Sequence, residues 1–121
     1  MKEDRVLSKI RLNASKKGIY LWRNNNGAVH TTDGRFIRFG LANDSKQLNE
    51  KLKSADLIGI KPLVVTTEMV GKTVGIFFSR EVKREGWKYT GTAREIAQLA
   101  WINLINSLGG DASFIMHEDD L

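Results

Sequence analysis

The sequence contains no cysteine, which excludes a disulfide framework and a thiolate metal site. Its two histidines, His30 and His117, lie far apart and lack the spacing of metal ligands. No apolar run approaches the roughly 20 residues that span a membrane. No apolar signal-peptide core follows the charged residues 1–5. These absences predict a cytoplasmic protein with no membrane partner.

The length and the charge indicate one domain with a polyanionic partner. A chain of 121 residues with 41% hydrophobic residues can bury a real but modest core, so we expect a single domain over 1–121. The formal net charge is +5, although residues 117–121 hold three acids and no Lys or Arg. The acidic end is expected to be a flexible tail. The remaining body is more basic than the total, which favours binding to a phosphate backbone.

The hydrophobic pattern predicts an α/β domain with a central mixed β-sheet flanked by helices. A helical pattern runs over 2–17 and stops at Gly18, and a second helix begins at the capping box of Thr92 and Glu95 and ends before 109–110. Apolar and β-branched runs predict strands at 19–22, 35–39, 55–60, 63–67, 73–83 and 112–116. A hairpin through 68–72 would join two of these strands, and 44–53 is either a loop or a short helix.

Two carboxylates and a lysine lie in or beside these strands, namely Asp56 and the segment Glu81-Val82-Lys83. Successive strand residues point to opposite faces, so Glu81 and Lys83 share a face. If the Asp56 strand lies beside theirs, the three side chains form a Mg²⁺ site with a lysine that can orient water at a phosphate. The alternative is an exposed edge strand guarded by a lysine, with Asp56 in a surface turn.

Five short motifs follow one another in the same order as in a known nuclease family. The first three are Glu3 with Val6 and Ile10, the aromatic-Arg-Asn-Asn-x-Gly segment 22–27, and the small-Asp-hydrophobic-hydrophobic-Gly segment 55–59. The other two are the E-x-K segment 81–83 and Gln98 with Trp101, Ile102 and the glycines 109–110. In these motifs the chain resembles the VRR-NUC domains, the virus-type replication-repair nucleases of the PD-(D/E)xK superfamily.

The resemblance implies a PD-(D/E)xK restriction-endonuclease-like core and a role for each matching residue. Asp56 and Glu81 would be metal ligands, with the carbonyl of Val82 as a third, and Lys83 the catalytic lysine. The cofactor would be Mg²⁺, with Mn²⁺ as a substitute. Gln98 and Glu3 would assist from the two helices. Gln98 can also be read as a solvated polar residue, and Glu3 as an acid that suits a first helical turn, where Asp4 could replace it.

The resemblance also implies a substrate: stand-alone members of the family look like homodimers that cut branched DNA, above all four-way junctions, in a phage or bacterial host cytoplasm. A flap nuclease, a non-specific duplex nuclease and a non-catalytic binding module remain alternatives. The basic aromatic loop 84–91 suits phosphate contacts and base stacking, or covers the second helix. The candidate DNA-binding residues are Arg23, Asn24, Asn25, Arg35, Arg38, Lys72, Arg84 and Lys88.

Overall fold

The computed structural model describes residues 2–121 and shows a mixed α/β protein, as expected. Within this part of the chain there are three α-helices and six short strands. They divide into two compact units, Met1–Lys61 and Pro62–Leu121, which we call the N-terminal unit and the C-terminal unit. Each unit is described by itself.

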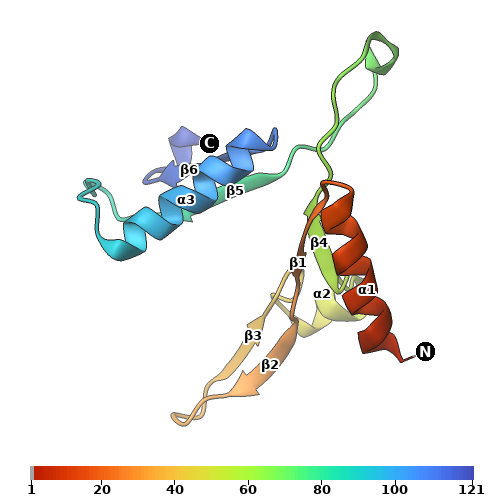
Figure 1. Ribbon diagram of the computed structural model, residues 1–121. Helices are drawn as coiled ribbons and strands as arrows, with labels where there is room; N and C mark the ends of the chain where they lie inside the picture. The colour runs from red at the N-terminus through yellow and green to blue at the C-terminus, as the bar shows by residue number, and fades with distance from the viewer. Residues whose placement is uncertain (1) are drawn as a thin grey trace. The chain divides into compact units, whose positions relative to one another are not determined.

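The N-terminal unit contains a helix on a strand pair, and a separate hairpin (Figure 1). Its elements are α1 (Glu3–Lys16), β1 (Tyr20–Arg23), β2 (Gly27–His30), β3 (Phe36–Phe39), α2 (Lys46–Lys51) and β4 (Leu57–Ile60). β1 and β4 are antiparallel with Tyr20 opposite Ile60, and β2 and β3 form an antiparallel hairpin. α1 lies beside β1 and buries Ala14, so the small core of this unit lies between the helix and the β1–β4 pair.

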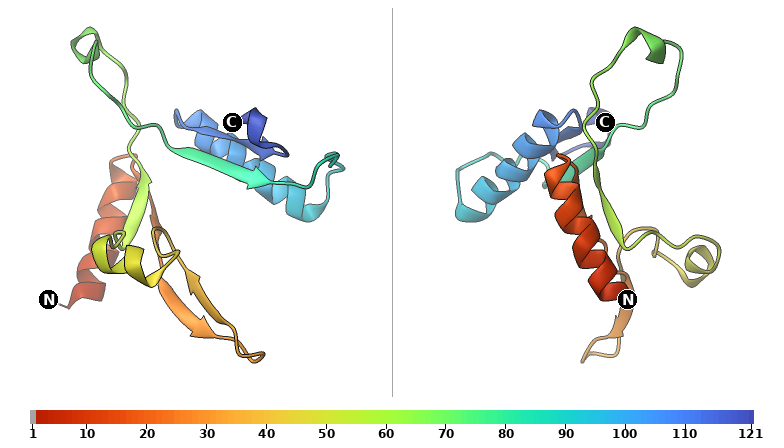
Figure 2. Two further views of the ribbon diagram at one scale, coloured as in Figure 1. Left: turned by 180° about the vertical axis from the view of Figure 1, so that it is seen from behind. Right: turned by 45° about the vertical axis from the view of Figure 1, so that its right-hand side comes forward.

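The C-terminal unit is a β-α-β arrangement (Figure 2). Its elements are the 3₁₀ turn η1 (Thr67–Met69), β5 (Phe78–Val82), α3 (Ala93–Ser107), β6 (Asp111–Ile115) and the 3₁₀ turn η2 (Glu118–Asp120). β5 and β6 are parallel, so the chain must cross over between them, and α3 is that crossover. Ile102 and Ile105 of α3 and Ala112 of β6 are buried, and they form the core of this unit.

The two helices with capping signals were predicted correctly. α1 ends before Gly18, which adopts a φ of 73° that glycine accepts without strain. α3 begins with the predicted capping box, in which the Thr92 side chain accepts from the Glu95 amide and the Glu95 side chain accepts from the Thr92 amide. Between 44 and 53, the helical alternative is confirmed over Lys46–Lys51, where the Ser45 side chain is the N-cap.

The predicted strand at 63–67 and the hairpin through 68–72 are wrong. Val64 and Val65 are 84% and 77% exposed, and β5 begins at Phe78 instead of Thr73. Among the described residues no strand pairs with 63–67 or 73–76, while the Phe77 carbonyl, directly before β5, accepts from the Asp111 amide at 2.8 Å. Valine and isoleucine favour an extended chain, but a strand also needs a partner to satisfy its backbone hydrogen bonds. The composition of these segments could not supply that information.

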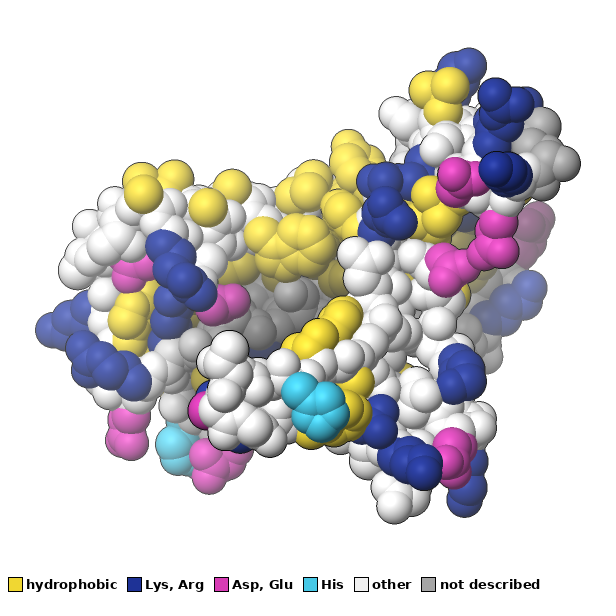
Figure 3. Space-filling view, turned by 90° about the horizontal axis from the view of Figure 1, so that it is seen from below, with side chains coloured by type: hydrophobic (Ala, Val, Ile, Leu, Met, Phe, Trp, Pro, Cys, Tyr) yellow, Lys and Arg dark blue, Asp and Glu magenta, His cyan; other side chains and the backbone are white. Residues whose placement is uncertain are grey.

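The described strands pair two by two, as β1–β4, β2–β3 and β5–β6, where the sequence predicts one central mixed sheet. β2 was not predicted, because the polar residues before it resemble a turn. Apolar side chains remain exposed beside Lys and Arg, as the space-filling view of one face shows (Figure 3). Within residues 2–121, no helix combines the length and the apolar character that crossing a membrane requires.

Candidate active site

Glu81, Lys83 and Gln98 form a hydrogen-bonded network in the C-terminal unit. The Lys83 ammonium donates to Oε1 of Gln98 at 2.8 Å, and Nε2 of Gln98 donates to Oε1 of Glu81 at 2.9 Å. Glu81 lies in β5 and Lys83 directly follows it, whereas Val82 between them is 75% exposed. The prediction that Glu81 and Lys83 share one face is therefore confirmed. The Gln98 amide joins the two charged groups from α3.

Two aromatic rings lie close to the lysine of this network. Nζ of Lys83 is 5.2 Å from the ring centroid of Trp87 and 5.6 Å from that of Phe114. Such contacts help to hold the side chain in place, since the negative faces of the rings attract a cation. The Trp87 and Phe114 rings lie 4.7 Å apart, so this part of the 84–91 loop covers β6 and restricts where Lys83 can move. The loop was expected either to contact DNA or to pack over the protein, and Trp87 packs over the protein.

Glu95 anchors the same loop from the first turn of α3. Its side chain is 6% exposed and accepts from Nε1 of Trp87 at 2.9 Å, from both the amide and the hydroxyl of Thr90, and from the amide of Thr92. These donors, the Thr92 amide foremost, stabilise the carboxylate and lower the pKa of Glu95 to about 2. The spacing of the capping box predicted the bond between Glu95 and Thr92. Nothing in the sequence predicted the bonds from Trp87 and Thr90 to Glu95.

The low pKa of Glu95 predicts a pH dependence of stability. The folded carboxyl titrates near 2 and its ordinary value is 4.5, so its contribution is complete above about 4.5. That contribution disappears as the pH falls from 4.5 towards 2, because the unfolded state then binds a proton that the folded carboxylate does not. We expect Glu95→Gln to lower Tm at neutral pH and to flatten the dependence of Tm on pH in this window. Thermal unfolding followed by circular dichroism measures both.

The control for this prediction is Glu85→Gln, which removes an exposed acid from the same loop. It should leave the slope of Tm against pH as it is in the unchanged protein. A Glu95→Gln protein that retains the full acid-dependent loss of stability would show that other carboxyl groups cause it.

A hollow of about 360 Å³ opens beside the Glu81–Gln98 contact. Its lining consists of Ser79, Glu81, Arg94, Ala97, Gln98, Trp101 and Ile102. Nε1 of Trp101 donates to Oγ of Ser79 at 3.0 Å, which fixes the indole at one wall. A carboxylate, an amide and a guanidinium thus face one solvent-filled space, and a charged group of a substrate could enter it.

Asp56 lies in a second hollow, in the N-terminal unit. This space of about 320 Å³ is lined by Glu3, Asp4, Leu7, Arg23, Asn24, Asn25 and Asp56. Glu3 and Asp4 come from the first turn of α1, and Arg23 ends β1. The structure therefore brings four of the predicted residues to Asp56, namely Glu3, Arg23, Asn24 and Asn25, as well as Asp4, which was weighed as a replacement for Glu3.

Asn24 holds the segment that precedes Asp56. Its amide nitrogen Nδ2 donates to Oγ of Ser54 at 2.7 Å and to the carbonyl of Ala55 at 2.9 Å. The backbone N–H of Asn24 donates to the carbonyl of Asp56 at 2.9 Å. Ser54 also accepts from Asn26 at 2.6 Å and donates to the carbonyl of Leu41 at 2.7 Å. The asparagine cluster is thus a positioning device for Asp56, and nothing in the sequence alone pointed to Ser54 as its centre.

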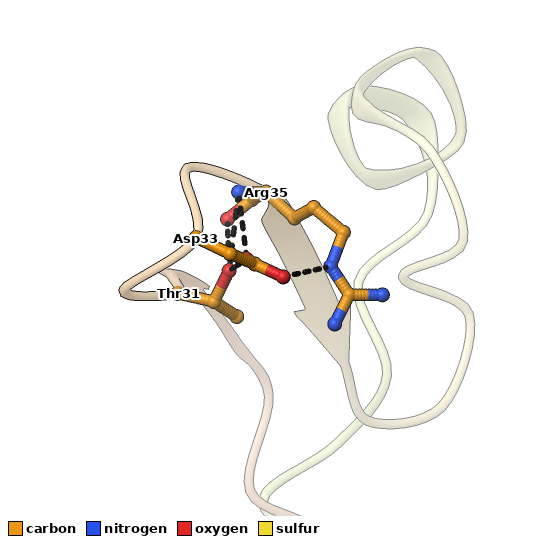
Figure 4. A network of polar contacts seen from close by, with 3 residues as sticks. All are labelled: Thr31, Asp33 and Arg35. Atoms are coloured by element: carbon orange, nitrogen blue, oxygen red, sulfur yellow. Dashed lines mark hydrogen bonds and ion pairs between the residues drawn. The ribbon is translucent and has the colours of Figure 1, made fainter.

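The other predicted DNA-binding residues are spread over both units. Arg35 bonds to Asp33 at 3.0 Å in the turn between β2 and β3, where Thr31 also donates to Asp33 (Figure 4). The Thr31 hydroxyl and the Arg35 amide lower the pKa of Asp33. Arg38 donates to Asn43 at 3.2 Å. Exposed cations of the C-terminal unit complete the set, namely Lys72, Arg84 and Lys88.

The donor chemistry suits a hard divalent cation. Within residues 2–121, no three side chains of the His, Cys, Asp and Glu types are grouped as a metal site. Mg²⁺ needs fewer, since one or two carboxylates suffice when waters and a substrate phosphate complete the octahedron. Gln98 occupies one oxygen of Glu81, which leaves the second oxygen to face a ligand. Each carboxylate is thus of the type that Mg²⁺ binds, Asp56 in the N-terminal unit and Glu81 in the C-terminal unit. The expected pairing of their strands is not found among the described residues, because β4 pairs with β1 and β5 pairs with β6.

None of the protein families, curated proteins and solved structures with which the chain was compared matches it. The resemblance to VRR-NUC domains therefore rests on the five motifs alone.

Proposed function

We propose that the protein is a Mg²⁺-dependent structure-specific DNA endonuclease of the VRR-NUC type, with a PD-(D/E)xK core. The observation that carries the proposal is the Glu81–Gln98–Lys83 network. In it the side-chain amide of Gln98, from α3, holds a carboxylate and an ammonium on one face of β5. An ordinary exposed E-x-K edge would leave both side chains to water. Here both are half-buried and hydrogen-bonded, as residues with a fixed task would be.

The mechanism assigns one task to each group. Asp56 and Glu81 would hold the metal ion with the carbonyl of Val82, and a bound Mg²⁺ would polarise the scissile phosphate and its water. Lys83 orients the attacking water and stabilises the negative charge that develops on the phosphate. Gln98 fixes the directions of Glu81 and Lys83. Asn24 and Ser54 hold the segment that contains Asp56, directly before β4.

The distribution of charge supports a nucleic-acid substrate. Residues 1–61 hold 13 of the 19 Lys and Arg residues and 6 of the 14 Asp and Glu residues, a formal charge of +7. Residues 62–121 carry the other 6 basic and 8 acidic residues, a formal charge of −2. The basic residues therefore concentrate in the unit that contains Asp56, where a polyanion would be attracted. We propose branched DNA as the substrate and a homodimer as the active form, because two strands need two sites.

Cleavage of labelled DNA substrates tests this proposal. A four-way junction, a 5′ flap and a linear duplex are each incubated with and without Mg²⁺, using the unchanged protein and Asp56→Ala. We expect Mg²⁺-dependent cutting of the junction, which Asp56→Ala abolishes. Preferential cutting of the flap or the duplex would support a metal-dependent nuclease but contradict the four-way junction as its substrate. Binding without any metal-dependent cutting would identify a non-catalytic module and refute the enzyme.

A further inference from the structure

We propose that the solvent face of α1 binds the phosphate backbone of duplex DNA through four cations, Lys2, Arg5, Lys9 and Lys16. We call this set the basic stripe. In a helix of 3.6 residues per turn, Arg5, Lys9 and Lys16 fall within roughly 40° of one another, and Lys2 is the N-cap of the same helix. Leu7 and Ala14, which are half-buried and buried, lie on roughly the opposite side. The inference rests on the proposed function, and it names a surface where the DNA would be held beside the site.

The stripe is free to meet an anion from outside. All four side chains are exposed, and in the described part of the chain none of them makes an ion pair or a side-chain hydrogen bond. Some other cations of the N-terminal unit are engaged within it, since Arg35 pairs with Asp33 and Lys46 with Glu50. Lys53 donates to Asn49 at 2.8 Å. The cations of the stripe therefore have no ion pair or side-chain hydrogen bond to give up on binding DNA.

The dimensions and the charge of the stripe match one strand of a duplex. From Lys2 to Lys16 a helix rises about 21 Å, and over that length one DNA strand presents about six phosphates. Four cations on a unit of formal charge +7 provide the complementary charge. The acids of the helix, Glu3 and Asp4, lie off the stripe and line the Asp56 hollow. A backbone bound along the stripe would thus lead to Asp56.

A membrane surface suits this helix less well than DNA does. A helix that lies in a bilayer interface inserts an apolar face opposite its charged one. In α1 that position is occupied by Leu7 and Ala14, which pack in the N-terminal unit. The exposed apolar side chains of α1, namely Val6, Ile10 and Leu12, flank the stripe on its two sides and form no single apolar face opposite it. A phosphate backbone therefore suits the stripe better, because it supplies the higher charge density. Anionic vesicles are included in the experiment to distinguish the two sources of phosphate.

Salt-dependent binding of duplex DNA tests the proposal in a Lys83→Ala background, in which cleavage does not interfere. The quadruple variant Lys2→Gln, Arg5→Gln, Lys9→Gln and Lys16→Gln keeps residues of good helix propensity. Its affinity, measured by fluorescence anisotropy, should fall by at least about a hundredfold near 0.1 M salt. The slope of log K against log salt should decrease by about 3 to 4, since each lost phosphate contact removes about 0.9. Circular dichroism confirms that α1 remains folded.

The matched control is Lys46→Gln, Lys51→Gln, Lys53→Gln and Lys61→Gln, which removes the same charge from the same unit. We expect its slope to stay within about 1 of that of the reference protein. Equal losses in the two quadruple variants would overturn the stripe and leave only an effect of net charge. Unchanged DNA binding with loss of binding to phosphatidylserine vesicles would also overturn it. If the protein with Lys83 intact cuts no DNA while the stripe-dependent binding is present, the proposed nuclease is refuted and the stripe is supported.

Discussion

Lys83→Met is expected to lower the rate of DNA cleavage about a thousandfold, the scale on which a positioned electrostatic group contributes to a transition state. Methionine retains an unbranched side chain, but removes the ammonium that donates to Gln98 and lies near the rings of Trp87 and Phe114. DNA binding should change little, because one cation is lost among 19 Lys and Arg residues. Single-turnover cleavage at saturating enzyme separates the chemical step from binding.

Lys88→Met is the matched control, since it removes an exposed lysine of the adjacent loop. Its single-turnover rate should stay within a few-fold of that of the unchanged protein. Gln98→Met should give a smaller loss than Lys83→Met, because Gln98 acts by holding two other groups. As a positioning residue it should also alter the pH–rate profile, whereas a residue with a purely structural task should not. Equal rates in Lys83→Met and Lys88→Met would contradict the role assigned to Lys83.

The candidate site was predictable from the sequence only where local periodicity determines it. The alternation of a strand placed Glu81 and Lys83 on one face, and the spacing of Thr92 and Glu95 gave the start of α3. The partners that reach these residues from other segments had no local signal. Neither the rings of Trp87 and Phe114 near Lys83 nor the Ser54 hydroxyl beneath Asn24 follows from spacing.

The strand pairings show the same limit for the fold. Residues 63–67 and 73–76 carry β-branched side chains typical of strands, yet they are exposed and belong to no strand pair within residues 2–121. Residues 27–30 carry a weak signal, yet they pair with 36–39 because a tight turn brings the two segments together. Strand formation depends on a partner, and in both cases the decisive information lies outside the segment itself. Helix α3 carried its own signal, since capping is a local interaction.

Gly59→Ala is expected to destabilise the N-terminal unit by about 3 kcal/mol or more, as overpacking against fixed backbone does. Gly59 of β4 lies opposite Leu21 of β1, and a Cβ at this position would lie 1.7 Å from the carbonyl oxygen of Tyr20. The strands would have to separate to admit it. Asp56 directly precedes β4, so cleavage should also be lost. Hydrogen exchange of the β1 amides measures the separation of the two strands, and urea unfolding measures the loss of stability.

Gly75→Ala supplies the control, because a Cβ at Gly75 would meet no atom within 4 Å. Its stability should change by no more than about 0.5 kcal/mol. Any change should be an increase, because alanine lowers the conformational entropy of the unfolded chain. The contrast separates a clash at β1 from the general effect of alanine on an extended chain. If Gly59→Ala were as stable as Gly75→Ala, the β1–β4 register would be wrong. The position of Asp56 beside Arg23 and Asn24 would then be wrong as well, since that register holds it there.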